Sequence, residues 1–328
     1  MFIGDFMKII VIGCGSIGRR HMKNLIDLNV DEVIGVDLNE EYCEWVRENL
    51  FLKTYTDLNE ALEKEKPNGV LICTPPNSHV KLAKIVTKYN SHIFIEKPLS
   101  DSLEGIDELI EITKQNKIKC TVGYNLRFNK GIQKIKKIIE NQKYGKILYS
   151  KILVGQYLPD WRPWQDYKES YTARKELGGG IILDASHEID YALWFFGIPK
   201  EILSISDKVS NLEVNVEDTS EVILQFENKT IVNIHLDFVR RDKKRCCEIV
   251  FENGTVYYDL INNELKEFDV KENKWNIEKI EEDVNEMYVN EMKHFIKMIN
   301  ENIGPSCSLE EAKKTLEVCL KIKENVKI

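Results

Sequence analysis

The stretch KIIVIGCGSIG, residues 8–18, decides the fold of the first part of the chain. It opens on a continuous apolar run from Ile9 onward, which is typical of a parallel strand buried on both faces of a sheet. Glycines follow at positions 13, 15 and 18, and a helix is expected over residues 16–28. The spacing G-x-G-x-x-G between a strand and a helix predicts a site for the pyrophosphate of a dinucleotide.

Each glycine of this motif has its own physical reason. Gly13 allows the tight turn, Gly15 lets the backbone approach a pyrophosphate, and Gly18 allows close packing of the helix on the strand. Ser16 and Ile17 begin the helix, where unpaired N–H groups and the positive end of the helix dipole attract phosphates. These five residues are the first expected cofactor contacts. The alternative is a glycine-rich turn without a ligand.

The acidic residue Asp37 distinguishes between the two nicotinamide dinucleotides. It ends a second expected strand, residues 33–37, nineteen positions after Gly18. A carboxylate at this place accepts hydrogen bonds from the hydroxyl groups of the adenosine ribose and repels a 2′-phosphate. The next two residues, Leu38 and Asn39, supply no arginine for such a phosphate. The sequence therefore favours NAD over NADP as the cofactor.

Strands and helices alternate regularly over the first 123 residues, which predicts a doubly wound parallel sheet of the Rossmann type. We expect a dinucleotide-binding domain over residues 1–123. Met7 directly precedes the first strand, so residues 1–6 are expected to be a frayed extension or part of a misassigned start. The other expected strands cover residues 69–74, 92–96 and 119–123, and the other expected helices cover residues 40–49, 57–64, 77–89 and 102–115.

The pattern changes near residue 146, where apolar and polar positions alternate between short turns. This period of two predicts antiparallel strands with one face exposed to water. Helices expected over residues 129–142 and 178–196 would cover the other face. The fold class is therefore α/β, with an N-terminal Rossmann domain and a C-terminal α+β domain over residues 124–328 whose sheet is mostly antiparallel. The last helices, about residues 305–325, are expected to pack back on the first domain.

Composition argues against several classes of partner. The 328 residues include 46 basic and 54 acidic side chains, a formal net charge of −8, which argues against nucleic acid. No apolar run reaches the roughly 18 residues that a membrane helix needs, and the N-terminus lacks signal-peptide features, so we expect a cytoplasmic protein without membrane contact. The eight cysteines show neither a C-x-x-C pair nor zinc spacing, which predicts reduced thiols and no metal site.

A second candidate site lies in GGGIILDASHEIDYALWFFG, residues 178–197, where titratable groups interrupt an apolar stretch. Read as a helix, the stretch places Asp184, His187, Glu188 and Tyr191 on one face beside bulky apolar neighbours. Such a patch is either a satisfied buried network or a working site. The segment HEIDY lacks the second histidine of the zinc motif H-E-x-x-H, so no metal is expected there.

The long segment of residues 157–180 is rich in aromatic side chains and ends in the three glycines at positions 178–180. Its apolar positions show no clear periodicity. A loop of this length in a compact domain is typical of a lid or a binding loop. Trp161 and Trp164 are expected to stack on a sugar ring or a base, and Arg162 is expected to hold a carboxylate or a phosphate. The alternative is an aromatic packing or oligomer contact.

Further motifs follow the later strands: TPPNSH at 74–79, EKP at 96–98 and GYNLRF at 123–128. Together with GCGSIG and the segment from 178 to 197, this set resembles the Gfo/Idh/MocA family of NAD(P)-dependent sugar oxidoreductases. The resemblance extends along the whole chain, because the C-terminal segment from Met287 looks like the family's closing pair of helices. The motifs are specific to the family and much less specific to a substrate.

The resemblance implies roles for individual residues. Lys97 is the implied catalytic lysine, and Asp184 and His187 complete the catalytic group and contact the substrate. The family pattern separates this Asp and His by four positions and the present chain by three, and both spacings keep the pair on one helix face. His187 keeps an H-x-x-D relation to Asp190, which would orient the imidazole.

The remaining implied contacts lie in the same motifs. Glu96 is implied near the nicotinamide ribose, Thr74, Pro75 and His79 near the adenosine and pyrophosphate, and Asn125 and Arg127 at the domain junction, facing cofactor and substrate.

The implied function is hydride transfer between nicotinamide and a carbinol carbon of a sugar, a sugar acid or a nucleotide-sugar, with Lys97 and His187 moving the hydroxyl proton. Two alternatives within the family are an NAD-dependent glycoside hydrolase that oxidises its substrate transiently and a non-catalytic sensor of sugar or NAD. The second sheet often forms a dimer interface in the family, so a homodimer or homotetramer is expected.

Overall fold

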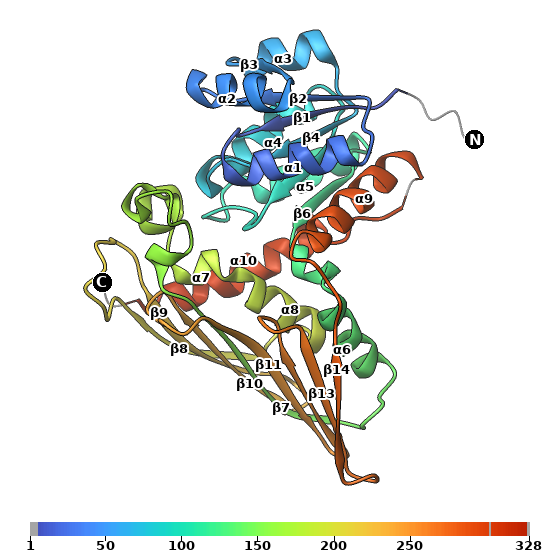
Figure 1. Cartoon of the computed structure of the whole chain (residues 1–328), viewed down its shortest axis with the longest axis vertical. Helices are drawn as coiled ribbons and strands as arrows, with labels where there is room; N and C mark the ends of the chain where they lie inside the picture. Colours follow the sequence, from blue (N-terminus) through green and yellow to red (C-terminus); the bar gives the residue numbers. More distant parts are fainter. Residues whose placement is uncertain (1–5, 302, 327–328) are drawn as a thin grey trace. The chain divides into compact units, whose positions relative to one another are not determined.

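The computed structural model describes residues 6–301 and 303–326, which form two compact units (Figure 1). The first unit joins the chain up to Asn125 with Asn285–Lys313, and the second joins Leu126–Val284 with the residues from Lys314 onward. A return of the chain to the first unit was expected for residues 305–325, and the segment that belongs to this unit is Asn285–Lys313, which begins earlier and adds a C-terminal helix. The expectation for residues 1–6 lies almost entirely outside the described residues.

The first unit contains a six-stranded sheet in the order β3-β2-β1-β4-β5-β6, in which every pairing is parallel. The chain order reverses between β1 and β4, and ligands of doubly wound sheets lie at the carboxyl ends of the strands at this point. The doubly wound prediction is confirmed. The strands are β1 (Lys8–Ile12), β2 (Glu32–Val36), β3 (Lys53–Tyr55), β4 (Gly69–Ile72), β5 (His92–Glu96) and β6 (Cys120–Gly123).

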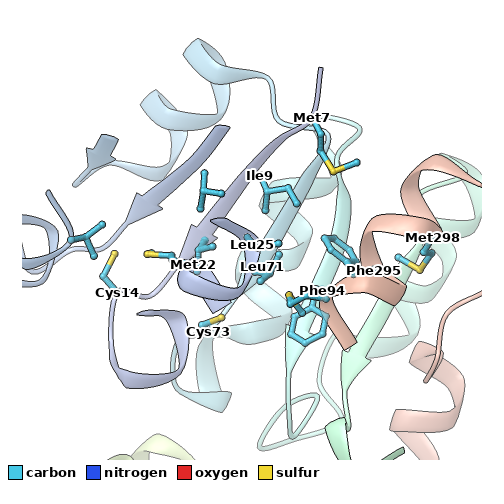
Figure 2. Close-up of a cluster of buried hydrophobic side chains, with 14 residues drawn as sticks. Met7, Ile9, Cys14, Met22, Leu25, Leu71, Cys73, Phe94, Phe295 and Met298 are labelled. Atoms are coloured by element: carbon cyan, nitrogen blue, oxygen red, sulfur yellow. The ribbon is translucent and has the colours of Figure 1, made fainter. Parts of the chain in front are cut away.

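One face of this sheet carries the buried core shown in Figure 2. Ile9 and Leu71 point from the sheet toward Leu25 of one helix, and Phe94 meets Phe295 of another with ring centroids 5.9 Å apart. Burial of these apolar side chains drives the packing of the helices on the sheet. The helices of the first unit are α1 (Ser16–Asp27), α2 (Glu40–Leu50), α3 (Leu58–Glu65), α4 (His79–Thr87), α5 (Ile106–Gln115) and α9 (Glu286–Asn300).

The second unit contains an eight-stranded sheet in the order β14-β13-β12-β11-β7-β10-β9-β8. Its neighbours are antiparallel except β7 and β10, which run parallel. The mostly antiparallel sheet is therefore confirmed. The strands are β7 (Ile147–Gly155), β8 (Glu201–Asp207), β9 (Thr219–Gln225), β10 (Ile231–Asp237), β11 (Lys244–Phe251), β12 (Gly254–Asp259), β13 (Glu264–Asp269) and β14 (Lys274–Lys279).

Helices α6 (Lys130–Glu140), α7 (Ile181–Asp184) and α8 (Ser186–Phe196) pack against one face of this sheet, as expected (Figure 1). The single helix expected over residues 178–196 is wrong, because the backbone breaks at Ala185 with φ −92° and ψ 25°. The apolar period continues through the break and hides it from a sequence pattern. The last helix, α10 (Leu309–Lys323), begins in the first unit and ends in the second. No helix among the described residues has the length and apolar character required to span a membrane.

Candidate functional site

The expected site residues fall in both units and are described unit by unit. In the first unit, Gly13 has φ +96° and its missing Cβ would lie 2.7 Å from the Cys73 carbonyl oxygen, so the turn requires glycine. A Cβ on Gly18 would lie 1.8 Å from the Gly13 carbonyl oxygen, which explains the close packing of α1 on β1. These two glycines are required by the fold itself.

Gly15 is different from the other two glycines of the motif. A Cβ there would meet nothing within 4 Å, and its φ of −75° is open to any residue. Gly15 is also the N-cap of α1, and no side chain caps this helix end. The first-turn N–H groups of Ser16 and Ile17 therefore have no capping side chain at the positive end of the helix. This arrangement fits a dinucleotide pyrophosphate, because the fold itself gives no other reason for a glycine at position 15.

Asp37 lies at the carboxyl end of β2 and is held by two backbone groups. Its Oδ2 accepts from Cys14 N at 2.7 Å, and its Oδ1 accepts from Asn39 N at 2.9 Å. Each carboxylate oxygen keeps a further lone pair, so ribose hydroxyls could still donate to both. Arg19 donates from Nε to the Cys14 carbonyl and stacks on Trp45 at 3.9 Å from the ring centroid. The position suits a ribose diol and places a fixed negative charge where NADP carries its 2′-phosphate.

The loops after β4 and β5 are braced against each other by His79. Its Nε2 contacts the Thr74 carbonyl at 2.7 Å and its Nδ1 contacts the Pro98 carbonyl at 2.9 Å. Burial lowers the pKa of His79, so the neutral imidazole donates only one of these two hydrogen bonds at a time. Pro75 precedes a turn of 3₁₀ helix, and the Lys97–Pro98 peptide is cis. His79 thus holds the two loops together, and direct cofactor contacts of Thr74, Pro75 and His79 stay predictions.

Glu96 ends β5 and is held on both sides of its carboxylate. Its Oε1 lies 2.6 Å from His21 Nε2 of α1, and its Oε2 accepts from Lys97 N at 3.1 Å. Lys97 itself is half-buried at the carboxyl edge of the sheet, where cofactors of this fold lie. Asn125 is buried, and its side-chain oxygen has no hydrogen-bond partner among the described residues. It therefore offers an acceptor, as a ligand contact requires.

In the second unit, Asp184 ends α7 and accepts two hydrogen bonds from the preceding loop. Tyr171 Oη donates to its Oδ1 at 2.9 Å and Thr172 Oγ1 donates to its Oδ2 at 2.7 Å. His187 lies beyond the break, in the first turn of α8, and both side chains are more than 90% buried. The expected placement of this pair on one continuous helix is therefore wrong. The break at Ala185 gives the two side chains separate backbone supports despite their short spacing.

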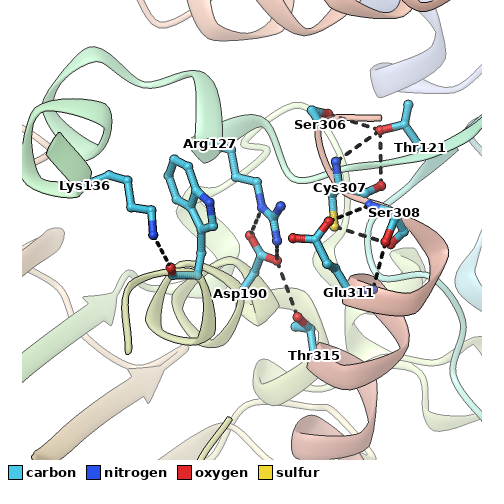
Figure 3. Close-up of polar contacts among 10 residues, drawn as sticks. Thr121, Arg127, Lys136, Asp190, Ser306, Cys307, Ser308, Glu311 and Thr315 are labelled. Atoms are coloured by element: carbon cyan, nitrogen blue, oxygen red, sulfur yellow. Dashed lines mark hydrogen bonds and ion pairs between the residues drawn. The ribbon is translucent and has the colours of Figure 1, made fainter. Parts of the chain in front are cut away.

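Two neighbouring acids of the same segment are satisfied by arginines. The Glu188 carboxylate accepts hydrogen bonds from Nε and Nη2 of Arg245 at 2.7 and 3.0 Å. Asp190 accepts hydrogen bonds from Nε and Nη2 of Arg127, both at 2.9 Å, and a longer one from Thr315 Oγ1 at 3.4 Å (Figure 3). The three acids of the apolar stretch thus belong to satisfied buried networks, whereas Ser186 Oγ and Tyr191 Oη have no hydrogen-bond partner among the described residues. Arg127 is held inside the second unit by this pair, and its contact with substrate and the orienting of His187 by Asp190 stay predictions.

The loop between β7 and α7 is built from short turns of 3₁₀ helix. Trp161 donates from Nε1 to the Gln156 carbonyl at 3.0 Å and packs edge-on against Phe238. Arg162 donates to Ser170 Oγ at 3.1 Å, which leaves other guanidinium N–H groups for an anion. Trp164 is 74% exposed. Of the two tryptophans, Trp161 is part of the packing and Trp164 remains open to a ligand.

Sequence reasoning missed His21 and Glu291 entirely. Both are buried, on α1 and α9, and lie close to Glu96. A signal was present, because each is a titratable residue at a position of the apolar stripe of an amphipathic helix. Their partner residues lie far apart in the sequence, so the pattern could not say what they contact.

Comparison with known proteins agrees with this geometry. The model of the oxidoreductase family with an NAD-binding Rossmann fold, GFO_IDH_MocA, matches residues 7–124, and the model of the GFO/IDH/MocA C-terminal domain matches residues 132–257. Myo-inositol 2-dehydrogenase from Thermotoga maritima is 29% identical over 326 residues, which cover 94% of this chain and 93% of the relative.

Two solved structures share the fold over almost their whole length. An oxidoreductase from Agrobacterium radiobacter, in complex with NAD+, L-tartaric acid and magnesium, has a TM-score of 0.87 at 17% identity and covers 98% of this chain and 96% of its own. The WlbA dehydrogenase from Bordetella pertussis, in complex with NADH and UDP-GlcNAcA, has a TM-score of 0.85 at 18% identity. The match covers 97% of this chain and 95% of that structure's chain. With both domain models matched in order, the chain belongs to the GFO/IDH/MocA family of NAD-binding oxidoreductases.

Proposed function

We propose that the protein is an NAD-dependent dehydrogenase, or a reductase in the opposite direction, that acts on a carbinol carbon of a sugar derivative. The observation that carries this proposal is the open space above Gly15 at the uncapped start of α1, together with Asp37 at the end of β2. NAD, when bound, supplies a hydride acceptor or donor at nicotinamide C4. The protein supplies the binding, the orientation and the proton transfer.

The proposed division of labour follows the chemistry of each side chain. Lys97 holds the substrate oxygen and exchanges its proton, because an ammonium group both donates a hydrogen bond to an alkoxide and releases a proton. His187 exchanges a proton with the substrate hydroxyl or with solvent. Asp184 accepts hydrogen bonds from Tyr171 and Thr172 and so presents a fixed negative charge that orients the substrate hydroxyl. Glu96 and Asn125 contact the nicotinamide half of the cofactor.

The substrate class comes from the relatives. The Thermotoga maritima relative is named for a cyclic polyol, and the Bordetella pertussis structure holds a nucleotide-sugar acid. Trp164, exposed on the loop after β7, suits the apolar face of a sugar ring, and Arg162 suits an anionic group. We therefore propose a sugar, a sugar acid or a nucleotide-sugar as the substrate. Localisation in the cytoplasm stays a prediction, with which the eight free cysteines are compatible.

A ligand screen with NAD present tests the proposal. Inositols, free sugars, sugar acids and nucleotide-sugars are added one at a time, and both thermal shift and absorbance of NADH are recorded. A dehydrogenase gives one class of ligand that stabilises the protein and also forms NADH. Product formation from a glycoside without net NADH would identify the hydrolase alternative. Stabilisation by a sugar without any turnover would identify the sensor.

Substitution of Gly15 separates cofactor binding from folding. Because a Cβ at this position meets nothing within 4 Å, we expect Gly15→Ala to leave the melting temperature of the free protein unchanged within about 1 °C. The methyl group enters the space into which a pyrophosphate would fit, so the dissociation constant of NAD should rise by about tenfold or more. Differential scanning fluorimetry and isothermal titration calorimetry measure the two quantities.

Gly304→Ala is the matched control for this substitution. Its Cβ also meets nothing within 4 Å, and the residue lies in the same unit, outside the glycine motif. It should change neither stability nor NAD affinity. If Gly15→Ala binds NAD as tightly as the unaltered protein, the pyrophosphate does not lie at this helix end.

We also propose that the open face of the second sheet joins two copies of the chain. Tyr149, Leu203, Ile205, Ile223 and Ile231 lie on this face according to the strand register, and all are 41–71% exposed. The opposite face is covered by α6, α7 and α8. Exposed apolar side chains gathered on one sheet face are typical of an interface between subunits.

A charge on this face should abolish the oligomer. Ile205 is 71% exposed, so Ile205→Glu should leave the fold of one chain intact. In a dimer the new carboxylate would be buried without a partner, which costs several kcal/mol. The variant should therefore be a monomer, and light scattering after size exclusion should give the mass of one chain. Ile198→Glu, a control 54% exposed outside the strands, should keep the larger mass. A single-chain mass for the unaltered protein would refute the proposal.

A further inference from the structure

Three buried titratable side chains meet inside the first unit, and only one of them, Glu96, has a part in the mechanism above. They are His21 of α1, Glu96 at the end of β5 and Glu291 of α9. Their relative exposures are 0%, 8% and 2%, and one side-chain nitrogen or oxygen of each lies within 4.8 Å of those of the other two. Within the part of the chain that the structure describes, no lysine or arginine side chain pairs with this imidazole and these two carboxyl groups. Their burial is therefore costly, and the arrangement requires an explanation.

The hydrogen bonds in this cluster are unevenly distributed. Glu96 is well satisfied, because His21 Nε2 lies 2.6 Å from one oxygen and Lys97 N donates to the other at 3.1 Å. Both oxygens of Glu291 are without a hydrogen-bond partner among the described residues, and so is His21 Nδ1. The groups that face Glu291 from neighbouring elements are His21, Glu96 and the buried thiol of Cys73, which directly follows β4. None of them is a fixed cation that could compensate a second carboxylate.

We propose that Glu291 is a neutral carboxylic acid in the folded protein and that, with His21, it positions Glu96 beside the cofactor. A protonated Glu291 has an O–H group to donate, and His21 Nδ1 is an acceptor when Nε2 carries the hydrogen given to Glu96. The chain Glu291–His21–Glu96, closed through one water, then gives a partner to His21 Nδ1 and to one oxygen of Glu291. The cluster keeps a single negative charge, on Glu96. The consequence for the cofactor rests on the proposed function.

A metal ion fits the cluster less well than a proton. Two ligands bound to one ion at about 2.1 Å in a tetrahedral site lie roughly 3.4 Å apart. His21 Nε2 and Glu96 Oε1 are 2.6 Å apart, which is the distance of a hydrogen bond with the hydrogen between them. Protonation of Glu291 agrees with its surroundings, since burial first and the charge of Glu96 second raise its pKa well above the usual range.

The pH dependence of stability tests the charge of Glu291 without any ligand. A carboxyl group whose pKa is raised on folding binds its proton more tightly in the folded state. The free energy of unfolding therefore falls as pH rises above the pKa of the unfolded state, about 4.3, and it becomes constant above the pKa of the folded state. Glu291→Gln resembles the neutral acid and lacks this loss. The difference in melting temperature, Glu291→Gln minus the unaltered protein, should therefore increase above about pH 4.5 by roughly 3 °C per pH unit.

Glu301→Gln, exposed just beyond the same helix, is the control and should show a flat difference. A flat difference for Glu291→Gln as well would show that Glu291 is ionised in the folded protein and would overturn the proposal. So would a divalent metal present at one equivalent in the purified protein and absent from Glu291→Gln.

Affinities for oxidised and reduced cofactor test the positioning role. The nicotinamide ring is positively charged only in NAD+. Removal of a nearby negative charge would therefore weaken the binding of NAD+ by about tenfold and leave the binding of NADH unchanged. We expect Glu291→Gln to bind both forms within about twofold of the unaltered protein, since it removes no charge. Glu291→Ala should weaken both forms by about fivefold, because Glu96 loses its support, and glutamine in place of alanine restores binding.

A tenfold loss of NAD+ alone in Glu291→Gln would overturn the neutral acid, and unchanged binding in Glu291→Ala would overturn the positioning role. Failure of the unaltered protein to bind either cofactor would instead refute the proposed function, while the pH arm would still report the charge of Glu291.

Discussion

Replacement of Lys97 by methionine should lower kcat by about a thousandfold, because proton transfer by a positioned side chain contributes roughly 10²–10⁴ in rate. Methionine keeps the length and apolar stem of lysine and removes only the ammonium group. Lys97 follows Glu96, whose carboxylate is fixed by His21 and by Lys97 N, so the backbone at this turn should not move. The dissociation constant of NAD should therefore stay within about threefold. Steady-state kinetics with the substrate found in the screen and calorimetric NAD titration measure both effects.

Lys88→Met is the matched control, since Lys88 is exposed at the end of α4 in the same unit. It should change neither kcat nor NAD affinity. A kcat for Lys97→Met within about fivefold of the unaltered enzyme would remove Lys97 from the proton transfer and leave that task to His187. Loss of NAD binding in Lys97→Met would instead make the lysine a cofactor contact.

The sequence predicted the elements whose pattern depends on burial alone. Strand β5 was expected at its observed bounds, because an apolar run buried on both faces leaves little choice of register. The short edge strand β3 and the pair β13 and β14 were missed. Their side chains are mostly half-buried in β3 and β13 and exposed in β14, so the apolar alternation that marks a strand is absent. Such strands form through hydrogen bonds to a neighbour that the local sequence does not contain.

The candidate site was predictable where one motif contains both the residue and its reason. Gly13, Gly15 and Gly18 are of this kind, and the structure adds only that the fold requires the first and last while the middle one leaves space. The buried pairs were not predictable, because Glu188 and Arg245 are 57 positions apart and no local pattern joins them. The polar face of α8 therefore showed that partners must exist and not which ones they are.

The largest stability effect is expected from Arg127→Ala. Arg127 and Asp190 are 7% and 1% exposed and share two hydrogen bonds of 2.9 Å inside the second unit. Removal of the guanidinium group leaves a buried carboxylate without its counter-charge, which costs about 3–5 kcal/mol. For a unit of this size the melting temperature should fall by roughly 10 °C, measured by calorimetry on the full chain.

Two further variants separate the charge from the contact. Lys134→Ala breaks an ion pair with Glu278 in which both side chains are exposed, and it should cost less than about 1 kcal/mol. The double variant Arg127→Met with Asp190→Leu removes both charges and should recover most of the loss, because two apolar side chains need no compensation. If Arg127→Ala were as stable as Lys134→Ala, the buried pair would not support the second unit. Asp190 would then have to be protonated, and Arg127 would be available to bind an anionic substrate.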